Sequence, residues 1–535
     1  MNMITMIKIM IYLFYLFFVL FNVFISLNIF NKIVFVEISF LDMLSSHEWM
    51  WVILVDQFSM IFSCVVLWIS FFILIYSLSY MTLDLEKTKF YSYLLLFIFS
   101  MLILIYSFNI SSILLGWDGL GISSFLLIMF YNSVKSINSS LITILVNRIG
   151  DLFIIFYFSF SFIHSSWNIM FSFSEDYMIV LLLLAAASKS AQIPFSSWLP
   201  KAMAAPTPVS SLVHSSTLVT AGVYLIFRLP SSIWLMWKDS FFLISSLTMI
   251  MSSILALWSF DFKEVIAFST MSHMSFMMMT LFNGSPLLMF FHLCAHALFK
   301  ALMFMCSGFL IYFFLGCQDI RKLNLFFINA KIKFSFYISL ISMSGLPFLT
   351  GFFSKEIIIN SAINKTNYLY LYLMTIILTS AYSFRLFLFL STSKSYSLTS
   401  NNEILMSTSI FISSCSSVFF GALYQWFFIP LSSISNSSEI KLLILTFLIL
   451  GIMISLFQIK IFTFNFLNLF NSLLNLYNFK FFILSKNLFF LIFEKGWLMK
   501  KINFFLIFEN YSHFVFMNYP KIMWAIIFMT FITKS

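Results

Sequence analysis

The segment LLLLAAASKSAQIPFSSWLPKAMAAPTPVSSLVHSSTLVTAGVYLIFR, residues 181–228, decides how this chain folds. An apolar run ends there at a single lysine, Lys189, four prolines follow, and a new helical pattern begins that carries His214. Proline removes a backbone donor and interrupts a helix. We therefore predict a helix that breaks directly behind a buried amine, an arrangement typical of ion sites inside membranes.

The composition indicates that most of the chain lies in lipid rather than in water. Of the 535 residues, 61% are hydrophobic and 9% are charged, and the mean hydropathy is +1.02. Soluble domains are about one quarter charged, so this composition indicates a membrane protein that crosses the bilayer many times. The net charge of +10 comes from scattered Lys and Arg rather than a basic stripe, which excludes nucleic-acid binding. The five cysteines contain no CxxC pair and mostly lie in apolar segments, so they are interpreted as small hydrophobic residues.

Apolar runs long enough to span a bilayer recur roughly fifteen times, the first of them over Ile9–Asn28. Because backbone groups in lipid must be hydrogen-bonded within the chain, the predicted fold class is all-α, a polytopic helical bundle. Residues 33–51 are too polar to span and are predicted to lie at the membrane face. The excess of Phe (75) over Gly (13) and Pro (9) indicates a nucleotide bias toward A and T, which suits an organelle genome.

The pattern divides the chain into six parts. Five asparagines spaced three and four residues apart between Asn465 and Asn478 predict a helix with a polar stripe along the membrane surface, against the alternative of ordinary surface loops. The predicted parts are N-terminal helices with a surface segment (1–89), two halves with an interrupted helix each (90–230 and 240–392), extra transmembrane helices (405–458), the lateral helix (459–519) and a short C-terminal anchor (520–535). The two interruptions, Ser188–Pro200 and Ser344–Glu356, each have a lysine beside them, and paired breaks indicate the ion sites of a transporter.

Charges within the apolar segments are few. Each costs roughly 2.5 to 3.5 kcal/mol at the centre of a bilayer, so each is a functional candidate. The candidates are Asp118, Arg148, Asp151, Lys189, Lys300, Lys355, His214, His273, His292 and His296.

Two acidic candidates are expected near Lys189. Asp118 and Lys189 are predicted to form a pair that exchanges protons, with a static ion pair as the alternative. Arg148 and Asp151 are three residues apart and predict an ion pair on one helix face that neutralises itself.

His292, His296 and Lys300 fall at i, i+4 and i+8, which places them on one helix face as a possible proton wire. Two alternatives stand beside it: haem or metal ligation by the histidines, and hydrogen-bonded core histidines without a function. His214 lies in a Ser- and Thr-rich lining that suits water. The charges Asp261, Lys263 and Glu264 are expected to be solvated at the start of a helix.

A set of motifs resembles one known family. GWDGLG (116–121), NRIGD (147–151), SKSAQIPFSSWLPKAM (188–203), PTPVSSLVHSSTLVTAGVYLI (206–226), HLCAHALFKALMFMCSG (292–308), QDIRKL (318–323), SGLPFLTGFFSKE (344–356) and SAYSFRL (380–386) occur in this order. They look like the antiporter-like core of the proton-pumping NADH dehydrogenases, densely over residues 56–391. The QDIRKL loop and the C-terminal segments resemble the subunit 5 branch rather than the shorter subunits 2 and 4.

The resemblance implies two inverted repeats, discontinuous helices and a proton relay. The relay would consist of Asp118, Lys189, His214, His292, His296, Lys300 and Lys355, with Arg148 and Asp151 beside it. It implies no cofactor or metal in this subunit; FMN, iron-sulfur clusters and ubiquinone are expected in partner subunits. The implied partners are subunit 4 next to this chain, subunit 2 along the lateral helix, and lipids, in the mitochondrial inner membrane. A sodium/proton antiporter or hydrogenase-linked pump has a similar core and is the alternative.

The chain also departs from the family pattern. Asp118 stands where Glu is common. Its side chain is one methylene shorter than that of Glu, so it reaches less far toward Lys189. His273 stands where Gln is common.

Overall fold

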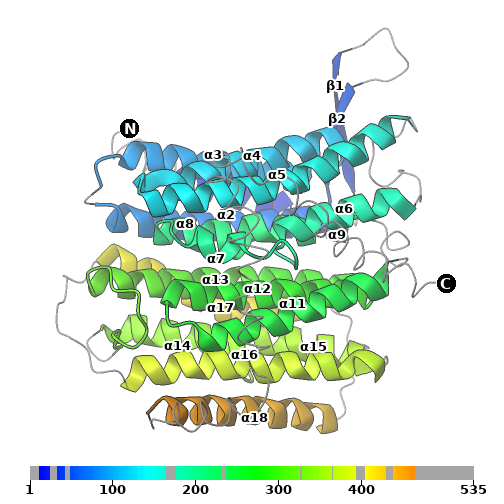
Figure 1. Ribbon diagram of the computed structural model, residues 1–535. Helices are drawn as coiled ribbons and strands as arrows, with labels where there is room; N and C mark the ends of the chain where they lie inside the picture. Colours follow the sequence, from blue (N-terminus) through cyan, green and yellow to red (C-terminus); the bar gives the residue numbers. More distant parts are fainter. Residues whose placement is uncertain are drawn as a thin grey trace, which may run out of the picture. The chain divides into compact units, whose positions relative to one another are not determined.

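The computed structural model describes residues 11–23, 33–41, 49–82, 84–163, 176–229, 237–325, 328–363, 366–392, 404–428 and 438–463. Within these ranges the chain is a bundle of helices packed side by side (Figure 1). Ten helices in the described ranges are long and apolar enough to cross a membrane, and shorter apolar helices accompany them. The prediction of a polytopic helical bundle is confirmed.

The helices follow one another as the apolar runs predict. A first helix, Ile11–Val23, packs its phenylalanines on Trp68 and Phe71 of the next one. The others are α2 (Gln57–Tyr80), α3 (Lys87–Tyr106), α4 (Ile110–Ile128), α5 (Val134–Ile163), α6 (Asp176–Lys189), α7 (Trp198–Ala202), α8 (Thr207–Leu212), α9 (Leu218–Arg228), α11 (Lys238–Trp258), α12 (Phe262–Phe282), α13 (Pro286–Phe313), α14 (Ala330–Ser344), α15 (Thr350–Ile363), α16 (Thr366–Thr392), α17 (Ile404–Phe428) and α18 (Ser438–Thr463).

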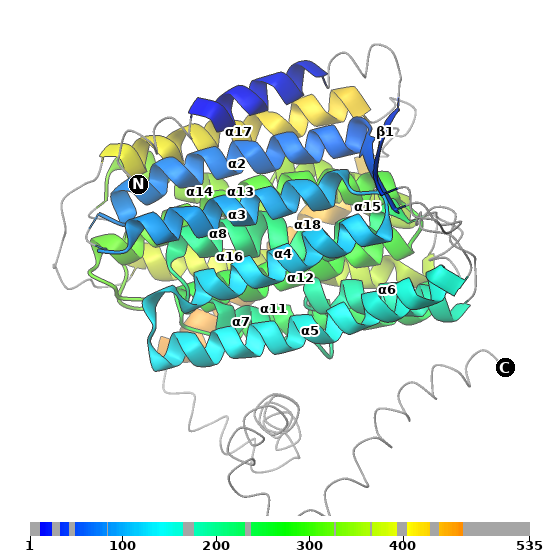
Figure 2. The ribbon, with the colours of Figure 1, turned by 90° about the horizontal axis from the view of Figure 1, so that it is seen from above.

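Two segments lie at the centre of the bundle. The stretch Thr207–Arg228 and helix α12 are buried over their whole membrane-spanning windows, while fewer than half of the residues in the windows of α5 and α17 are buried. Figure 2 shows α2 and α17 together on one side and α5 on the other, with α12 and α13 between them. Polar residues on the central segments are therefore shielded from lipid by a layer of protein, which lowers the cost of holding them in a membrane.

Both predicted breaks are present. α6 ends at Lys189, and the chain runs through a turn and the short helix α7 before α8 begins at Thr207. α14 ends at Ser344, because Gly345 adopts a left-handed conformation with φ of 87°, and α15 begins at Thr350. A left-handed residue ends a helix, and glycine adopts it at little cost. Each half of the chain thus has one interrupted helix with a lysine beside the interruption.

The helical bundle carries one element that the sequence pattern does not predict, a short β-hairpin. Strands β1 (Val34–Leu41) and β2 (Trp49–Val55) pair antiparallel, with Val34 opposite Val55. Val52 and Leu54 of β2 are buried with Phe108, which follows α3. The segment is rich in Val, Ile, Phe and Trp, which favour strands, and pairing satisfies the backbone groups of a run too short to span.

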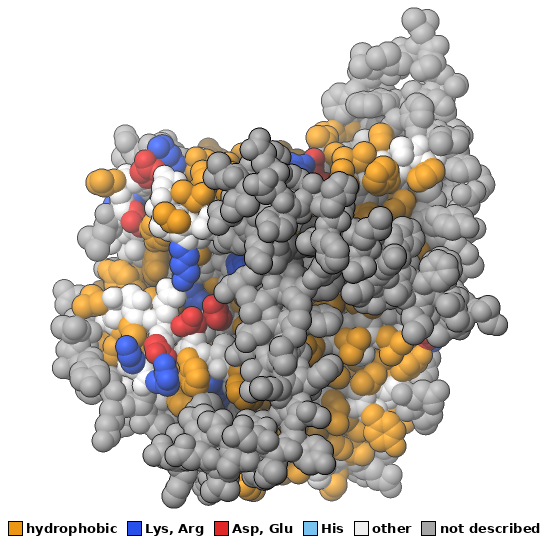
Figure 3. Space-filling view, viewed as in Figure 1, with side chains coloured by type: hydrophobic (Ala, Val, Ile, Leu, Met, Phe, Trp, Pro, Cys, Tyr) orange, Lys and Arg blue, Asp and Glu red, His pale blue; other side chains and the backbone are white. Residues whose placement is uncertain are grey.

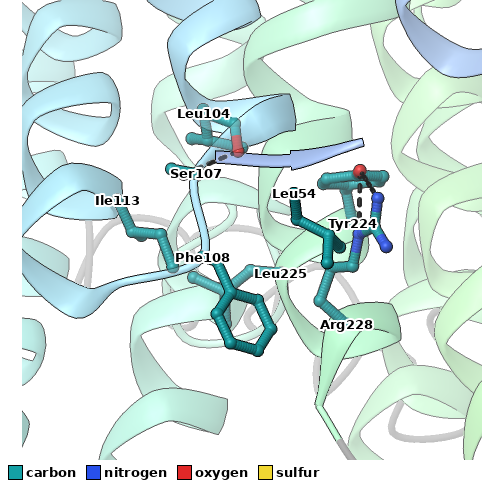
Figure 4. Close-up of a pocket in the computed structure, with 8 residues that line it drawn as sticks. All are labelled: Leu54, Leu104, Ser107, Phe108, Ile113, Tyr224, Leu225 and Arg228. Carbon is teal, nitrogen blue, oxygen red and sulfur yellow. Dashed lines mark hydrogen bonds between the residues drawn. The ribbon is translucent and has the colours of Figure 1, made fainter. Parts of the chain in front are cut away.

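An ion pair joins the start of α2 to the end of α9. Arg228 Nη2 donates to Asp56 Oδ1 at 2.9 Å, and the Arg228 Nε donates to the Tyr224 hydroxyl at 2.8 Å. Burial raises the pKa of the Asp56 carboxyl, but the hydrogen bonds and charge of Arg228 outweigh it and hold that pKa below its ordinary value. Tyr224 and Arg228 also line a small pocket of about 20 Å³ beside β2 (Figure 4).

Breaking this ion pair is expected to destabilise the bundle. Asp56→Asn or Arg228→Gln leaves a charge with its partner removed, and both side chains are at most 16% exposed. Loss of one partner of a buried pair costs roughly 3 to 5 kcal/mol. We expect each single variant to lower the thermal midpoint of the purified protein, and the double variant to lose less than the sum of the two. Additive losses would mean that the two side chains do not stabilise each other.

Two predicted parts lie outside the described residues. These are most of the lateral helix (459–519), of which only the first residues fall in α18, and the C-terminal anchor (520–535). The predicted extra transmembrane helices (405–458) correspond to α17 and α18. α18 packs on α16 where Gly451 lies against Ser380. The described surface is largely apolar, and on the face shown in Figure 3 the charged side chains gather toward one end of the helices.

Candidate functional site

Lys189 lies fully buried at the point where α6 ends. Its Nζ donates to the backbone carbonyl of Trp117 on α4 at 2.9 Å and lies 4.6 Å from the centre of the indole ring. The indole Nε1 in turn donates to Asp151 Oδ1 on α5 at 2.9 Å. Trp117 therefore connects the amine of α6 to a carboxylate of α5.

Asp118 takes a different partner from the one expected. Arg148 Nη1 lies 3.5 Å from Asp118 Oδ1 and 3.1 Å from Asp151 Oδ2, so the predicted pair of α5 extends to α4. No ion pair between Asp118 and Lys189 occurs among the described contacts. Successive residues of an α-helix are rotated by about 100°, so when Trp117 faces Lys189 the next residue faces outward. The exposed fractions agree, with 29% for the Asp118 side chain, 45% for Arg148 and 8% for Asp151.

His214 occupies the next position toward the centre. It lies in a π-helical turn, Val213–Thr217, between α8 and α9, and is fully buried. Neither ring nitrogen has a hydrogen-bond partner among the described residues. Turns of this type interrupt the regular hydrogen-bond pattern and are frequent at functional sites. The unpaired nitrogens leave His214 able to accept or donate a proton.

Lys263 is a functional candidate that sequence reasoning missed. The expectation of a solvated charge cluster at the start of α12 is wrong for this residue, which is only 6% exposed. Its Nζ donates to the carbonyl of Ala205 at 2.9 Å. Ala205 lies between α7 and α8, and carbonyls at a helix interruption lack a helical partner, so a lysine from a neighbouring helix can satisfy one. Asp261, two residues earlier, is exposed as expected.

The three histidines of α12 and α13 form one cluster. His273 Nδ1 lies 3.2 Å from His292 Nε2, and His292 Nδ1 lies 2.9 Å from Ser354 Oγ of α15. The ring centres of His273 and His296 are 5.4 Å apart, while those of His292 and His296 are 6.4 Å apart. The spacing in α13 correctly predicts one buried face for His292 and His296. It does not predict that His273 of α12 lies between them.

Two further lysines converge on the end of α14. Lys300 Nζ donates to Ser269 Oγ at 2.6 Å and lies 3.0 Å from Met343 Sδ. Lys355 Nζ donates to the carbonyl of Met343 at 2.7 Å and to Thr379 Oγ1 at 3.1 Å. Both lysines therefore contact Met343, one through its sulfur and the other through its backbone. The second break supplies the carbonyl oxygens that hold Lys355.

The contacts of the histidines are relevant to the alternative that these residues bind a metal or haem. In the described part of the chain no group of three or more His, Cys, Asp and Glu side chains converges as metal ligands do. His292 uses both ring nitrogens for His273 and Ser354, so ligation would break existing hydrogen bonds. Lys300 on the same helix would repel a bound cation. The geometry suits proton transfer between neutral and charged nitrogen groups.

Comparison with known proteins gives two family matches. The family described as "NADH:quinone oxidoreductase/Mrp antiporter, TM" matches residues 107–381, which hold the whole buried cluster. The family described as "NADH-Ubiquinone oxidoreductase (complex I), chain 5 N-terminus" matches residues 42–91. NADH-ubiquinone oxidoreductase chain 5 of Anopheles quadrimaculatus is 41% identical over 423 residues, 74% of this chain and 72% of the relative. The chain belongs to the NADH-ubiquinone oxidoreductase chain 5 family.

A second relative agrees with this assignment, and two solved structures share the fold. Chain 5 of Locusta migratoria is 42% identical over 402 residues, 70% of this chain and 69% of that relative. The fold matches the Mrp complex from Dietzia sp. DQ12-45-1b with a TM-score of 0.71 at 23% identity, covering 81% of this chain and about half (52%) of that one. It also matches an archaeal membrane-bound sulfane sulfur reductase with a TM-score of 0.70 at 18% identity, over 84% of this chain and 95% of that chain. At these identities the two solved structures show a shared fold alone.

Proposed function

We propose that this chain is a proton-translocating membrane subunit of respiratory complex I, the NADH:ubiquinone oxidoreductase. The observation that supports it is the set of buried amines and imidazoles, Lys189, Lys263, Lys300 and Lys355 with His214, His273, His292 and His296, placed along the centre of a chain 5 bundle. Charges at this depth are costly, so an ionisable residue there is by default a candidate for a transport function. Members of this chain's family carry the name of that enzyme.

The proposed relay uses the residues as donors and acceptors in sequence. Lys189, with Asp151 and Trp117, holds a proton at the first break, and Asp118 with Arg148 lies on the outer side of this group. His214 and Lys263 connect it to the α12–α13 cluster, and Lys300 passes protons to Lys355 at the second break. Moving one proton against 100 mV requires about 2.3 kcal/mol. Because a group passes on a proton only by gaining and then losing it, each lysine must alternate between its charged and neutral forms as the complex changes state.

The energy for this transport would come from redox chemistry in partner subunits. FMN, iron-sulfur clusters and ubiquinone would be held there, and this chain would carry no redox centre. The partly exposed ion pair of Asp118 and Arg148 lies among exposed leucines and isoleucines on α4 and α5, a surface that suits a neighbouring membrane subunit. We assign that neighbour as subunit 4, with subunit 2 along the lateral helix, and lipids elsewhere. The location that fits the family is the mitochondrial inner membrane.

A sodium/proton antiporter is the second candidate, because one of the matching family descriptions includes the Mrp antiporter. The match of residues 42–91 to complex I chain 5 favours the first candidate.

Native electrophoresis of solubilised membranes separates the two candidates. We expect the chain to migrate with a band that oxidises NADH, because a complex I subunit remains attached to the redox arm. Extraction with a harsh detergent that separates the redox arm serves as the control and should remove the activity from the band. Migration in a smaller band without NADH oxidation, together with sodium-driven proton exchange in vesicles, would favour the antiporter.

A further inference from the structure

The cluster around His273 contains an unbroken hydrogen-bonded chain across three helices. His273 of α12 contacts His292 of α13, and His292 contacts Ser354 of α15, at 3.2 and 2.9 Å. All three side chains are at most 1% exposed. We propose that His273 and Ser354 are proton-carrying residues, the two ends of a wire that crosses from α12 to the second break. The proposal rests on the proposed function of proton translocation.

The distances make His273 the connecting ring. His292 and His296 lie on the same face of α13, yet their ring centres are 6.4 Å apart, and the described contacts include no hydrogen bond between them. The ring of His273 lies 5.4 Å from each of them, and Phe299 packs against all three. A proton moving from His296 to His292 by way of His273 therefore takes two steps between rings 5.4 Å apart in place of one step between rings 6.4 Å apart.

The position of His273 on α12 also connects it to Lys300. Lys300 Nζ donates to Ser269 Oγ, and Ser269 precedes His273 by four residues, so the two lie on the same face of α12 one turn apart. The Nε2 of His273 has no hydrogen-bond partner among the described residues and is the nitrogen that can receive a proton. His273 thus stands between the amine of Lys300 and the ring of His292.

Each group of the wire gains one proton and loses one. A proton binds His273 Nε2, and the Nδ1 proton of that ring moves to His292 Nε2. The Nδ1 proton of His292 then moves to Ser354 Oγ, and the original hydroxyl proton of Ser354 leaves. It passes to the neutral amine of Lys355, the next residue of α15, whose Nζ contacts the carbonyls of Met343 and Ser344 at the break. The three groups begin and end neutral, and rotation of the rings and the hydroxyl restores the starting arrangement.

The test uses the assembled complex reconstituted in vesicles, with protons moved per NADH oxidised as the measurement. His273→Gln keeps an amide that can hydrogen-bond His292 but does not relay protons, and Ser354→Ala removes the hydroxyl. We expect both to lower the ratio, and the double variant to equal either single one, because a wire broken once carries no proton. Ser354→Thr keeps a hydroxyl and is expected to restore the ratio.

The controls separate this proposal from the proposed function. Ser361→Ala, on the same helix, removes a hydroxyl that donates to the Ile358 carbonyl within its own helix and should leave the ratio unchanged. Lys300→Ala should lower it. If Lys300→Ala lowers the ratio while His273→Gln and Ser354→Ala do not, the wire is refuted and the pump stands. If Lys300→Ala also has no effect, the proposed function fails. Additive losses, or no recovery in Ser354→Thr, would assign the residues to packing and overturn the proposal.

Discussion

Replacement of Lys189 by alanine is expected to uncouple this subunit: the assembled complex continues to oxidise NADH but moves fewer protons per electron. The substitution removes the donor to the Trp117 carbonyl and the cation above the indole ring. It leaves the Asp151 carboxylate with the indole Nε1 and Arg148, neither of which releases a proton at physiological pH. The end of α6 then lacks the buried amine that holds and releases a proton beside Trp117 and Asp151. The measurement is acidification of vesicles at matched rates of NADH oxidation.

Lys189→Arg distinguishes proton transfer from charge alone. Arginine keeps the positive charge but stays protonated under all physiological conditions. If Lys189 carries protons, the arginine variant pumps as poorly as the alanine variant. Lys322→Ala, a lysine exposed after α13, is the matched control and should behave like the unsubstituted chain. An unchanged proton-to-electron ratio in Lys189→Ala would remove Lys189 from the relay.

Gly351→Ala is expected to lower both the stability of the chain and its pumping. A methyl group at Gly351 overlaps the carbonyl oxygen of Ser342, so the start of α15 must move away from the end of α14. Overpacking of this kind costs roughly 1 to 3 kcal/mol, and more where backbone has to shift. The same contact holds the carbonyls of Met343 and Ser344 against Lys355. We therefore expect a lower thermal midpoint and less assembled complex, and weaker pumping in what assembles.

The chain offers a control for this substitution. A methyl group at Gly121, in the middle of α4, has no neighbouring atom within 4 Å. Alanine is the better helix former by about 1 kcal/mol, so Gly121→Ala is expected to be neutral or slightly stabilising. Equal thermal midpoints for the two variants would show that the α14–α15 contact tolerates expansion.

Much of the fold follows from local pattern. Apolar length predicts the spans because a bilayer of fixed thickness requires about 20 residues per helix, and proline or glycine beside Lys189 and Lys355 predicts the two breaks. The hairpin of β1 and β2 does not follow from this pattern, because length and polarity indicate only whether a segment can span a bilayer. Pairing with a second strand is a separate way to satisfy the same backbone groups.

The candidate site also follows in part from local sequence pattern and in part from tertiary packing. The sequence alone determined which side chains are too costly to lie in a membrane without a reason, and it placed His292, His296 and Lys300 on one face of one helix, because helical spacing is a local property. The tertiary structure alone decided which of these side chains meet. It turned Asp118 outward to Arg148 and brought Trp117 to Lys189. It also buried Lys263 against a break and set His273 between two histidines of another helix. Such contacts depend on how helices far apart in the chain pack and rotate, and no spacing within one helix contains that information.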